Sequence, residues 1–134
     1  MSPESPDRAE VAADRLRNLD LEGFSNLRVL VAGDFMLDEY LWGKVERISP
    51  EAPVAVVEVE RETRTLGGAG NVVNNLVALG ARVEVLGLVG DDNPGRLLTQ
   101  EMLRLGVAVD GLFTDPGRRT SRKTRVFGAS QQVV

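Results

Sequence analysis

The sequence predicts an α/β fold, in which a mostly parallel central sheet is flanked by helices and carries a small lid of β-strands. From residue 27 onward, short apolar runs alternate with amphipathic segments, in the order strand, helix, strand, helix, strand. Connections of this kind are right-handed crossovers between parallel strands. Residues 39–60 interrupt the alternation and contain two prolines, so this segment is expected to project from the sheet as a lid.

Four segments are expected to form strands outside the lid. Residues 27–33 and 82–88 are short and mostly apolar, which is typical of strands buried on both faces. Residues 107–113 and 120–127 follow further along the chain. The sequence Asp-Pro-Gly at residues 115–117 predicts a turn between them.

Two amphipathic segments are expected to form helices. The first opens at the glycine cluster of residues 67–71 and ends at Gly80, with an apolar stripe made of Val72, Val73, Leu76, Val77 and Leu79. The second opens at residues 91–94, where two acids suit the positive end of the helix dipole and an early proline suits the first turn. It ends at Gly106, and its inner face is expected to consist of Leu97, Leu98, Met102 and Leu105.

The lid is expected to contain two strands, residues 41–47 and 54–60. The loop between them, residues 48–53, holds prolines that forbid a helix. The second strand alternates toward its end, which indicates one wet face and an antiparallel pair. In open α/β sheets ligands bind at the carboxyl ends of the strands, and the lid, about residues 39–60, should lie beside them.

The chain divides into two parts. Residues 1–23 form an acidic amino-terminal extension with a weak helical pattern at Val11, Ala12, Leu16 and Leu19. Residues 24–134 are expected to be one folded unit, because 134 residues allow one domain or part of one. The chain stops inside what reads as a strand, so this unit is expected to be the amino-terminal part of a longer domain, incomplete at its carboxyl end.

Composition excludes several kinds of chemistry. Cysteine and histidine are absent, which excludes disulfides, thiolate nucleophiles, Cys/His zinc clusters and a histidine base. Carboxylates, cations, hydroxyls and backbone amides remain. No apolar run approaches the roughly 20 residues that span a bilayer, so we expect a cytoplasmic protein with no membrane partner.

The net charge of −4 hides a basic end of the chain. Residues 114–134 carry a single acid against Arg118, Arg119, Arg122, Lys123 and Arg125. A nucleic-acid binder interleaves such cations with aromatic residues, and here Phe127 is the only aromatic side chain near them. We therefore expect no nucleic-acid partner.

The glycine cluster is the sharpest local motif. Backbone amides of Gly67, Gly68 and Gly70 can approach a ligand closely, and the following helix points its free N–H groups at the same place. A tight turn that packs the helix against a strand explains the cluster equally well. It is neither a dinucleotide fingerprint, because Val73 replaces the required small residue and no strand is expected directly before it, nor a P-loop.

Two carboxylates and three cations are further candidates for a binding site. Asp34 and Asp38 follow a buried strand and can accept hydrogen bonds from vicinal hydroxyls, although Asp34 can equally cap the loop. The pair lacks a third ligand for a metal. Lys123 and Arg125 alternate on one predicted strand and suit a phosphate or carboxylate, or simply face solvent; Arg47, in the lid, can also reach an anion.

Four stretches together resemble the amino-terminal half of ribokinase-type (phosphofructokinase B-type) sugar kinases. They are the residues GDFMLD at 33–38, RISPEAPV at 47–54, GGAGNVVNNL at 67–76 and LVGDD at 88–92. The stretch RISPEAPVAVVEV, with KTRV and QQVV, is similar to the heptose 7-phosphate kinase branch of that family. The resemblance covers about residues 24–134 and implies a ribokinase-like fold.

The resemblance implies transfer of the ATP γ-phosphate, with Mg²⁺, to the anomeric hydroxyl of heptose 7-phosphate during ADP-heptose synthesis for lipopolysaccharide. It assigns Asp38 to the sugar hydroxyls and Gly67, Gly68 and Asn71 to the substrate loop. Weaker similarity adds Asp34, Arg47, Lys123 and Arg125, the cations serving a phosphate already on the sugar. It also implies a homodimer formed through the lid. Val73 departs from the small residue usual in the family.

The family's catalytic Asp and ATP site belong to its carboxyl-terminal half. We therefore expect no catalytic residue and no metal ligand in this chain, which would be the substrate-binding half of the enzyme and inactive alone. The alternative is a non-catalytic sugar-binding or assembly module.

Overall fold

The computed structural model describes residues 21–52, 54–128 and 131–132, together with Ala9, Ala13, Asp14 and Arg17. These four isolated residues are helical. The residues on which the weak amino-terminal helix was predicted, Val11, Ala12, Leu16 and Leu19, lie outside the described residues. A short 3-10 helix, η1 (Glu22–Asn26), leads into the folded unit. Within the described part of the chain, no helix is both long and apolar enough to span a membrane.

The central sheet is parallel and has the strand order β1-β4-β5. The strands are β1 (Arg28–Ala32), β4 (Arg82–Gly90) and β5 (Leu112–Asp115). The predicted α/β class is confirmed. The strand predicted at residues 107–113 is wrong in its bounds, because the chain touches β4 first at Ala108, turns at residues 110–111 and pairs again only from Leu112.

The helices α2 (Ala69–Ala78) and α3 (Asn93–Arg104) end where the glycines predict. Gly80 has a φ of 90° and Gly106 a φ of 75°, the left-handed conformation that ends many helices. The predicted inner face of α3 is confirmed at Leu98 and Met102, both fully buried. The prediction for α2 is wrong at Val72 and Leu79, which are exposed because they fall outside the stripe that packs on the core.

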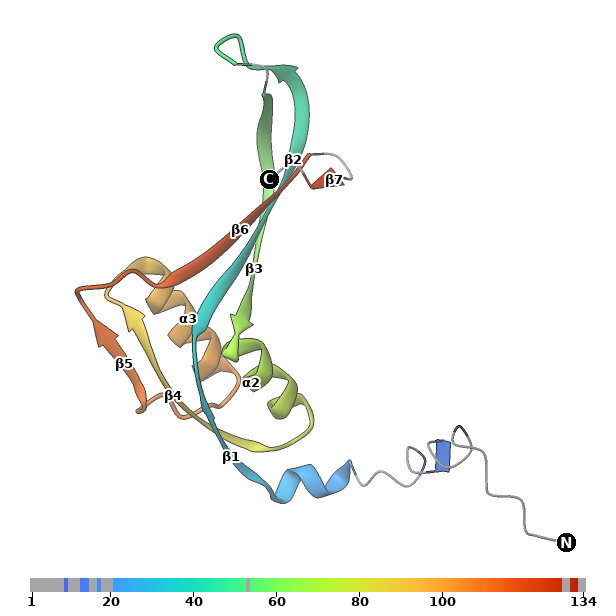
Figure 1. Ribbon diagram of the computed structural model, residues 1–134, viewed down its shortest axis with the longest axis vertical. Helices are drawn as coiled ribbons and strands as arrows, with labels where there is room; N and C mark the ends of the chain where they lie inside the picture. Colours follow the sequence, from blue (N-terminus) through green and yellow to red (C-terminus); the bar gives the residue numbers. More distant parts are fainter. Residues whose placement is uncertain are drawn as a thin grey trace, which may run out of the picture.

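Both helices lie on one face of the central sheet (Figure 1). β4 lies beside β1, and β5 lies on the far side of β4, so both crossovers move across the sheet in the same direction. Because both crossovers are right-handed, they place the two helices on the same side of the sheet. The core therefore lies between this face and the helices, and its fully enclosed members include Val73, Val85, Leu98 and Met102. The expectation that the strands are buried on both faces is wrong for the described residues, since Leu30, Leu86 and Leu88 are exposed on the other face.

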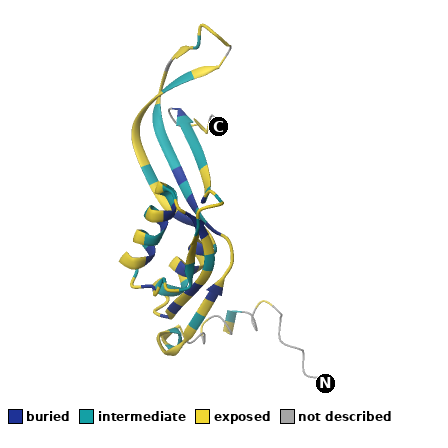
Figure 2. Cartoon of the chain, turned by 90° about the vertical axis from the view of Figure 1, so that its left-hand side faces the viewer, coloured by how far each residue is buried: buried dark blue, intermediate teal, exposed yellow. Residues whose placement is uncertain are grey.

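A second sheet of four strands forms the lid, in the order β3-β2-β6-β7. Its strands are β2 (Phe35–Ile48), β3 (Ala55–Gly68), β6 (Ser121–Gly128) and β7 (Gln131–Gln132). β2 pairs with β3 in antiparallel and with β6 in parallel orientation. Figure 1 shows this sheet rising out of the α/β body, and Figure 2 shows that burial is greatest in the body and at the base of the lid.

The lid is longer than the sequence predicted. Strands were expected at residues 41–47 and 54–60, whereas β2 and β3 have 14 residues each. No strand was predicted at residues 35–40, yet they alternate between buried and half-buried side chains, as a strand with two different faces requires. Gly67 and Gly68 are the last residues of β3, so the expectation that no strand precedes the glycine cluster is wrong.

Hydrogen bonds join the start of the lid strand β6 to the body. Asp92, at the N-cap of α3, accepts bonds from the Gly95 amide (2.9 Å), the Thr120 hydroxyl (2.7 Å) and the Thr120 amide (2.9 Å). The buried Thr120 hydroxyl also accepts a 2.8 Å bond from the Gly90 amide. The Asp92 carboxylate therefore holds Thr120, the residue before β6, beside the carboxyl end of β4.

Candidate functional site

The two faces of the lid sheet carry different chemistry. Directly paired residues on neighbouring strands share a face, and successive residues along a strand alternate between faces. In the register of β2, Asp38 stands between Thr65 and Lys123, whereas its neighbour Glu39 stands between Arg64 and Thr124. The face that contains Asp38 is called the Asp38 face below, and the opposite one the Glu39 face.

Asp38 is the centre of the candidate site. Its side chain is 18% exposed, and its Oδ1 lies 3.3 Å from Nη1 of Arg125. A Cβ built on Gly67 would stand 2.7 Å from Oδ2 of the same carboxylate, so only glycine leaves room for it there. The glycine predicted for the substrate loop and the carboxylate predicted for the sugar hydroxyls are therefore in contact range.

The turn from β3 into α2 brings Asp34 to the same place. Gly68 adopts a φ of 56°, and the Ala69 amide donates a 2.9 Å hydrogen bond to the carbonyl of Asp34. A side chain at position 68 would collide with that carbonyl. The backbone of Asp34 thus lies against Gly68, the neighbour of the glycine that contacts Asp38, and the Asp34 side chain is exposed.

The two predicted cations on β6 lie on the Asp38 face. Lys123 is the direct register partner of Asp38 and is exposed. Arg125 is two residues further along β6 on the same face, and its guanidinium lies 5.2 Å from the centroid of the Tyr40 ring and 3.3 Å from Oδ1 of Asp38. A guanidinium and an ammonium beside one carboxylate can bind a ligand that carries both hydroxyls and a phosphate.

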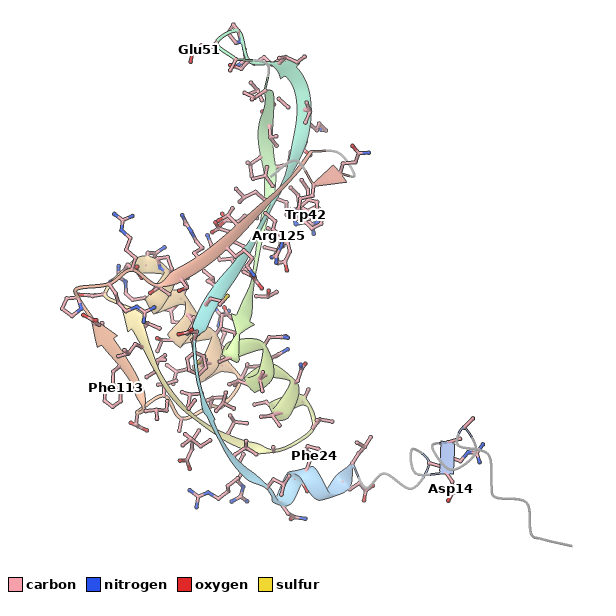
Figure 3. The ribbon with its side chains drawn as sticks, in the orientation of Figure 1. Asp14, Phe24, Trp42, Glu51, Phe113 and Arg125 are labelled. Atoms are coloured by element: carbon pink, nitrogen blue, oxygen red, sulfur yellow. The ribbon has the colours of Figure 1, made fainter. Side chains whose placement is uncertain are left out.

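Asn71 and Arg47 are not brought to Asp38 in this chain. Asn71 is exposed in the first turn of α2 and lines a cavity of about 330 Å³ with residues of β3, α2 and α3, a cavity that does not include Asp38. Arg47 is exposed near the tip of the lid, roughly 30 Å along β2 from Asp38 at about 3.3 Å per residue. Figure 3 shows the tip, marked by Glu51, far from Arg125.

Three aromatic side chains pack together on the Asp38 face of the lid sheet. Trp42 and Phe127 stack with ring centroids 4.3 Å apart, and Tyr40 lies 6.3 Å from Phe127. Arg61 covers the other side of Trp42 at 4.9 Å. The spacing of Tyr40 and Trp42 by two residues is the signal that would have placed both on one strand face.

Glu39 is a residue that sequence reasoning missed. It is 7% exposed, and its burial acts to raise the pKa of the carboxyl. A hydrogen bond shared with Glu62, hydrogen bonds from Thr124 and Arg64, and the charge of Arg122 outweigh burial and lower that pKa below its ordinary value of 4.5. Glu39 is therefore ionised at neutral pH inside the lid sheet.

A metal site is not evident in the part of the chain that the structure describes. None of its groups of His, Cys, Asp or Glu has three or more members placed to hold an ion. Asp92 has a pKa below its ordinary value of 3.8, chiefly because of the hydrogen bond from the Thr120 hydroxyl, but it is occupied by that structural contact. What the site offers is recognition of hydroxyls and anions.

Residues 26–134 match the family described as pfkB family carbohydrate kinase. The chain is 59% identical over 121 residues to the bifunctional protein HldE of Desulfatibacillum aliphaticivorans, an alignment that covers 90% of this chain and 25% of that protein. It is 67% identical over 105 residues to the bifunctional protein HldE of Pelobacter propionicus, covering 78% and 22% respectively. The chain thus spans about a quarter of the length of these relatives.

Solved structures share the fold. A carbohydrate kinase from Agrobacterium tumefaciens superimposes with a TM-score of 0.65 at 27% identity, covering 81% of this chain and 34% of that one. The ribokinase of Arabidopsis thaliana, solved with ribose and ATP, gives a TM-score of 0.61 at 19% identity and covers 79% and 34%. The predicted ribokinase-like architecture is therefore confirmed for the part of the fold that this chain contains.

Proposed function

The chain belongs to the pfkB family of carbohydrate kinases, and from this membership we propose that it is the substrate-binding part of an ATP-dependent sugar kinase. The observation that carries the proposal is the contact of Asp38 with both Gly67 and Arg125. A carboxylate beside a glycine that leaves it room can accept hydrogen bonds from two vicinal hydroxyls of a sugar. The proposal is that Asp38 orients the sugar so that one hydroxyl faces the phosphoryl donor.

We propose heptose 7-phosphate as the substrate, phosphorylated at its anomeric hydroxyl in ADP-heptose synthesis for lipopolysaccharide. The sequence similarity to the HldE proteins supports this branch of the family. Lys123 and Arg125 supply two positive charges on the Asp38 face, which suits a substrate that already carries a phosphate. Asp38 then binds the hydroxyls, and the two cations bind the 7-phosphate.

ATP and Mg²⁺ are proposed as cofactors of a full-length protein that contains this chain. The described residues do not fit either group, because they form neither a P-loop nor a cluster of three metal ligands. Transfer of a phosphoryl group depends on positioning and charge stabilisation of the γ-phosphate. We therefore expect these 134 residues alone to bind the sugar phosphate without phosphorylating it.

A homodimer formed through the lid, in the cytoplasm, completes the proposal. β3 is the outer strand of the lid sheet and is 14 residues long, with most of its side chains exposed. A long edge strand presents unpaired N–H and C=O groups that readily pair with another strand. A second lid can satisfy these groups. Arg47, near the tip of the same hairpin, is then a candidate to reach the partner subunit's substrate.

The test is a kinase assay on the full-length protein with ATP, Mg²⁺ and heptose 7-phosphate, followed by phosphorus NMR of the product. The expected product carries a new phosphate on the anomeric carbon. Hexose 6-phosphates and unphosphorylated heptose serve as competing substrates. Asp38→Asn should lower kcat/KM for the sugar by about a hundredfold, because it removes a charged acceptor from the sugar hydroxyls. Asp110→Asn, an exposed carboxylate in the turn before β5, is the control variant and should match the wild type.

A binding measurement, read together with the kinase assay, distinguishes the alternative of a non-catalytic module. Calorimetric titration of the 134-residue chain with heptose 7-phosphate measures binding without chemistry. Binding by the short chain together with phosphorylation by the full-length protein supports the kinase. Phosphorylation by the short chain alone would overturn the division of roles. Binding without phosphorylation in the full-length protein would favour the module.

A further inference from the structure

Glu39 is a buried charge on the lid face that points away from the substrate site. It follows Asp38 directly on β2, so the two carboxylates lie on opposite faces of the same sheet. The register places Arg64 of β3 and Thr124 of β6 on either side of Glu39. None of these three residues belongs to the sugar-binding group described above.

Both oxygens of Glu39 are engaged by neighbouring strands. Oε1 accepts a 3.3 Å hydrogen bond from Nε of Arg64, and Oε2 accepts a 3.0 Å bond from the hydroxyl of Thr124. Nη1 of Arg122 lies 3.7 Å from the same Oε2. One carboxylate therefore connects β3, β2 and β6, and with both oxygens bound and 7% exposure it is held in one orientation.

The connection to β6 is made at the residue between the two cations of the site. Thr124 separates Lys123 from Arg125, and these two side chains emerge on the Asp38 face. On that face the Asp38–Arg125 ion pair is partly exposed, and such a pair holds its members only weakly; the stack of Trp42 on Phe127 joins the same strands further toward the tip of the lid. Beside Lys123 and Arg125, the Glu39 face adds the Thr124 hydrogen bond and the Arg122 ion pair between β2 and β6.

We propose that Glu39 is a positioning residue, which holds β6 against β2 so that Lys123 and Arg125 stand beside Asp38 and receive the substrate's phosphate. This inference rests on the proposed function for its kinetic consequences. The holding of β6 by Glu39 is a property of the fold and can be measured without substrate.

The first measurement is hydrogen exchange of residues 121–128 in the full-length protein, read by mass spectrometry. Glu39→Ala is expected to speed exchange in this segment about tenfold or more, because the Thr124 hydroxyl loses its acceptor and Arg122 loses its ion pair with Glu39. Glu39→Gln keeps an acceptor oxygen and should exchange at an intermediate rate. The matched control is Glu60→Gln, which removes the ion pair of Glu60 with Lys44 in the outer lid and should leave residues 121–128 unchanged.

The second measurement separates positioning from general stability. Glu39→Ala is expected to raise KM for the sugar phosphate about tenfold while kcat stays within about threefold, and Glu39→Gln should recover most of the loss. In a background that carries both Lys123→Met and Arg125→Met, Glu39→Ala should change KM by less than about twofold, since the two residues through which it acts are gone. A merely structural residue would give fold-changes that multiply.

Each outcome decides the proposal. Unchanged exchange in residues 121–128 of Glu39→Ala, or fold-changes that multiply with those of the Lys123→Met/Arg125→Met double variant, would overturn it. If the wild-type protein phosphorylates no sugar phosphate, the proposed function fails, and the exchange measurement still decides whether Glu39 holds β6. If Glu39→Ala does not fold, Glu39→Gln and Thr124→Val, which removes the same hydrogen bond from the other strand, give the answer.

Discussion

Oδ1 of Asp38 and Nη1 of Arg125 lie 3.3 Å apart, although 87 positions separate the two residues in the sequence. The contact exists because β6 leaves the central body and pairs in parallel with β2, so that a basic segment late in the chain lies along an acidic position early in it. A carboxylate and a guanidinium that pair with each other can each exchange that partner for a complementary group of a ligand. Sugar hydroxyls can take the carboxylate while a phosphate takes the cation.

The space left by Gly67 is expected to control the orientation of Asp38. In Gly67→Ala the new Cβ would stand 2.7 Å from Oδ2 and 2.9 Å from Cγ of Asp38, so the carboxylate must move. We expect kcat/KM for the sugar to fall by about tenfold or more in the full-length protein, measured by steady-state kinetics. Gly117→Ala, in an exposed turn, is the control, and equal kinetics for both variants would contradict this role of Gly67.

Replacement of Arg125 should raise KM for a phosphorylated sugar more than KM for an unphosphorylated one. Arg125→Met keeps much of the side-chain volume but removes the charge that faces Asp38. We expect KM for the sugar phosphate to rise about 10- to 100-fold, with a much smaller change for the free sugar, as shown by competition assays. Arg119→Met, in the exposed loop before β6, should leave both values unchanged. Equal losses on the two substrates would count against a phosphate role.

Asp92 should make the stability of the chain depend on pH in the acid range. The hydrogen bonds from the Thr120 hydroxyl and amide lower its pKa below 3.8, so the folded state prefers the ionised form. A lowered folded pKa contributes stability that is present above the unfolded value and is lost as pH falls through the folded value. Urea midpoints measured from pH 6 downward should therefore fall less steeply below pH about 4 in Asp92→Asn than in the wild type. Parallel curves for the two proteins would show that Asp92 has no such effect.

Leu98 is expected to contribute strongly to the stability of the α/β core. Its side chain is fully buried between α3 and the central sheet, and Leu98→Ala should reduce the free energy of unfolding by about 3 kcal/mol. Leu103, on the same helix but 54% exposed, provides the matched control, for which the loss should stay below about 1 kcal/mol. Chemical denaturation followed by circular dichroism measures both. Similar losses would mean that α3 packs differently.

Prediction from the sequence succeeded where the pattern is local. The glycines at 80 and 106 end the helices as expected, because a left-handed residue after a helix is a local requirement. The alternation of strands and helices was enough to define the α/β class. The branch of the family followed from local residue strings such as RISPEAPV.

The extent of the lid was missed for a physical reason. Residues 61–65 are charged residues and threonines, with no apolar side chain to indicate a strand, and Asp38 is an unfavourable residue in a strand interior. Cross-strand partners compensate: Arg125 faces Asp38, and Arg64 and Thr124 face Glu39. Such compensation depends on the pairing of β6 with β2, which is a tertiary property that no local window contains.

The strict alternation along β2 limits how this site can change. A slip of β2 by one residue against its neighbours would bring Glu39 to the Asp38 face and Asp38 to the opposite face, and a slip of two would move every side chain by about 6.6 Å. The distance between Asp38 and the cations of β6 can therefore change only in steps of whole residue pairs. Under the proposed function, a change of substrate length in this lid then requires substitution of residues on the Asp38 face and not a sliding of the strands.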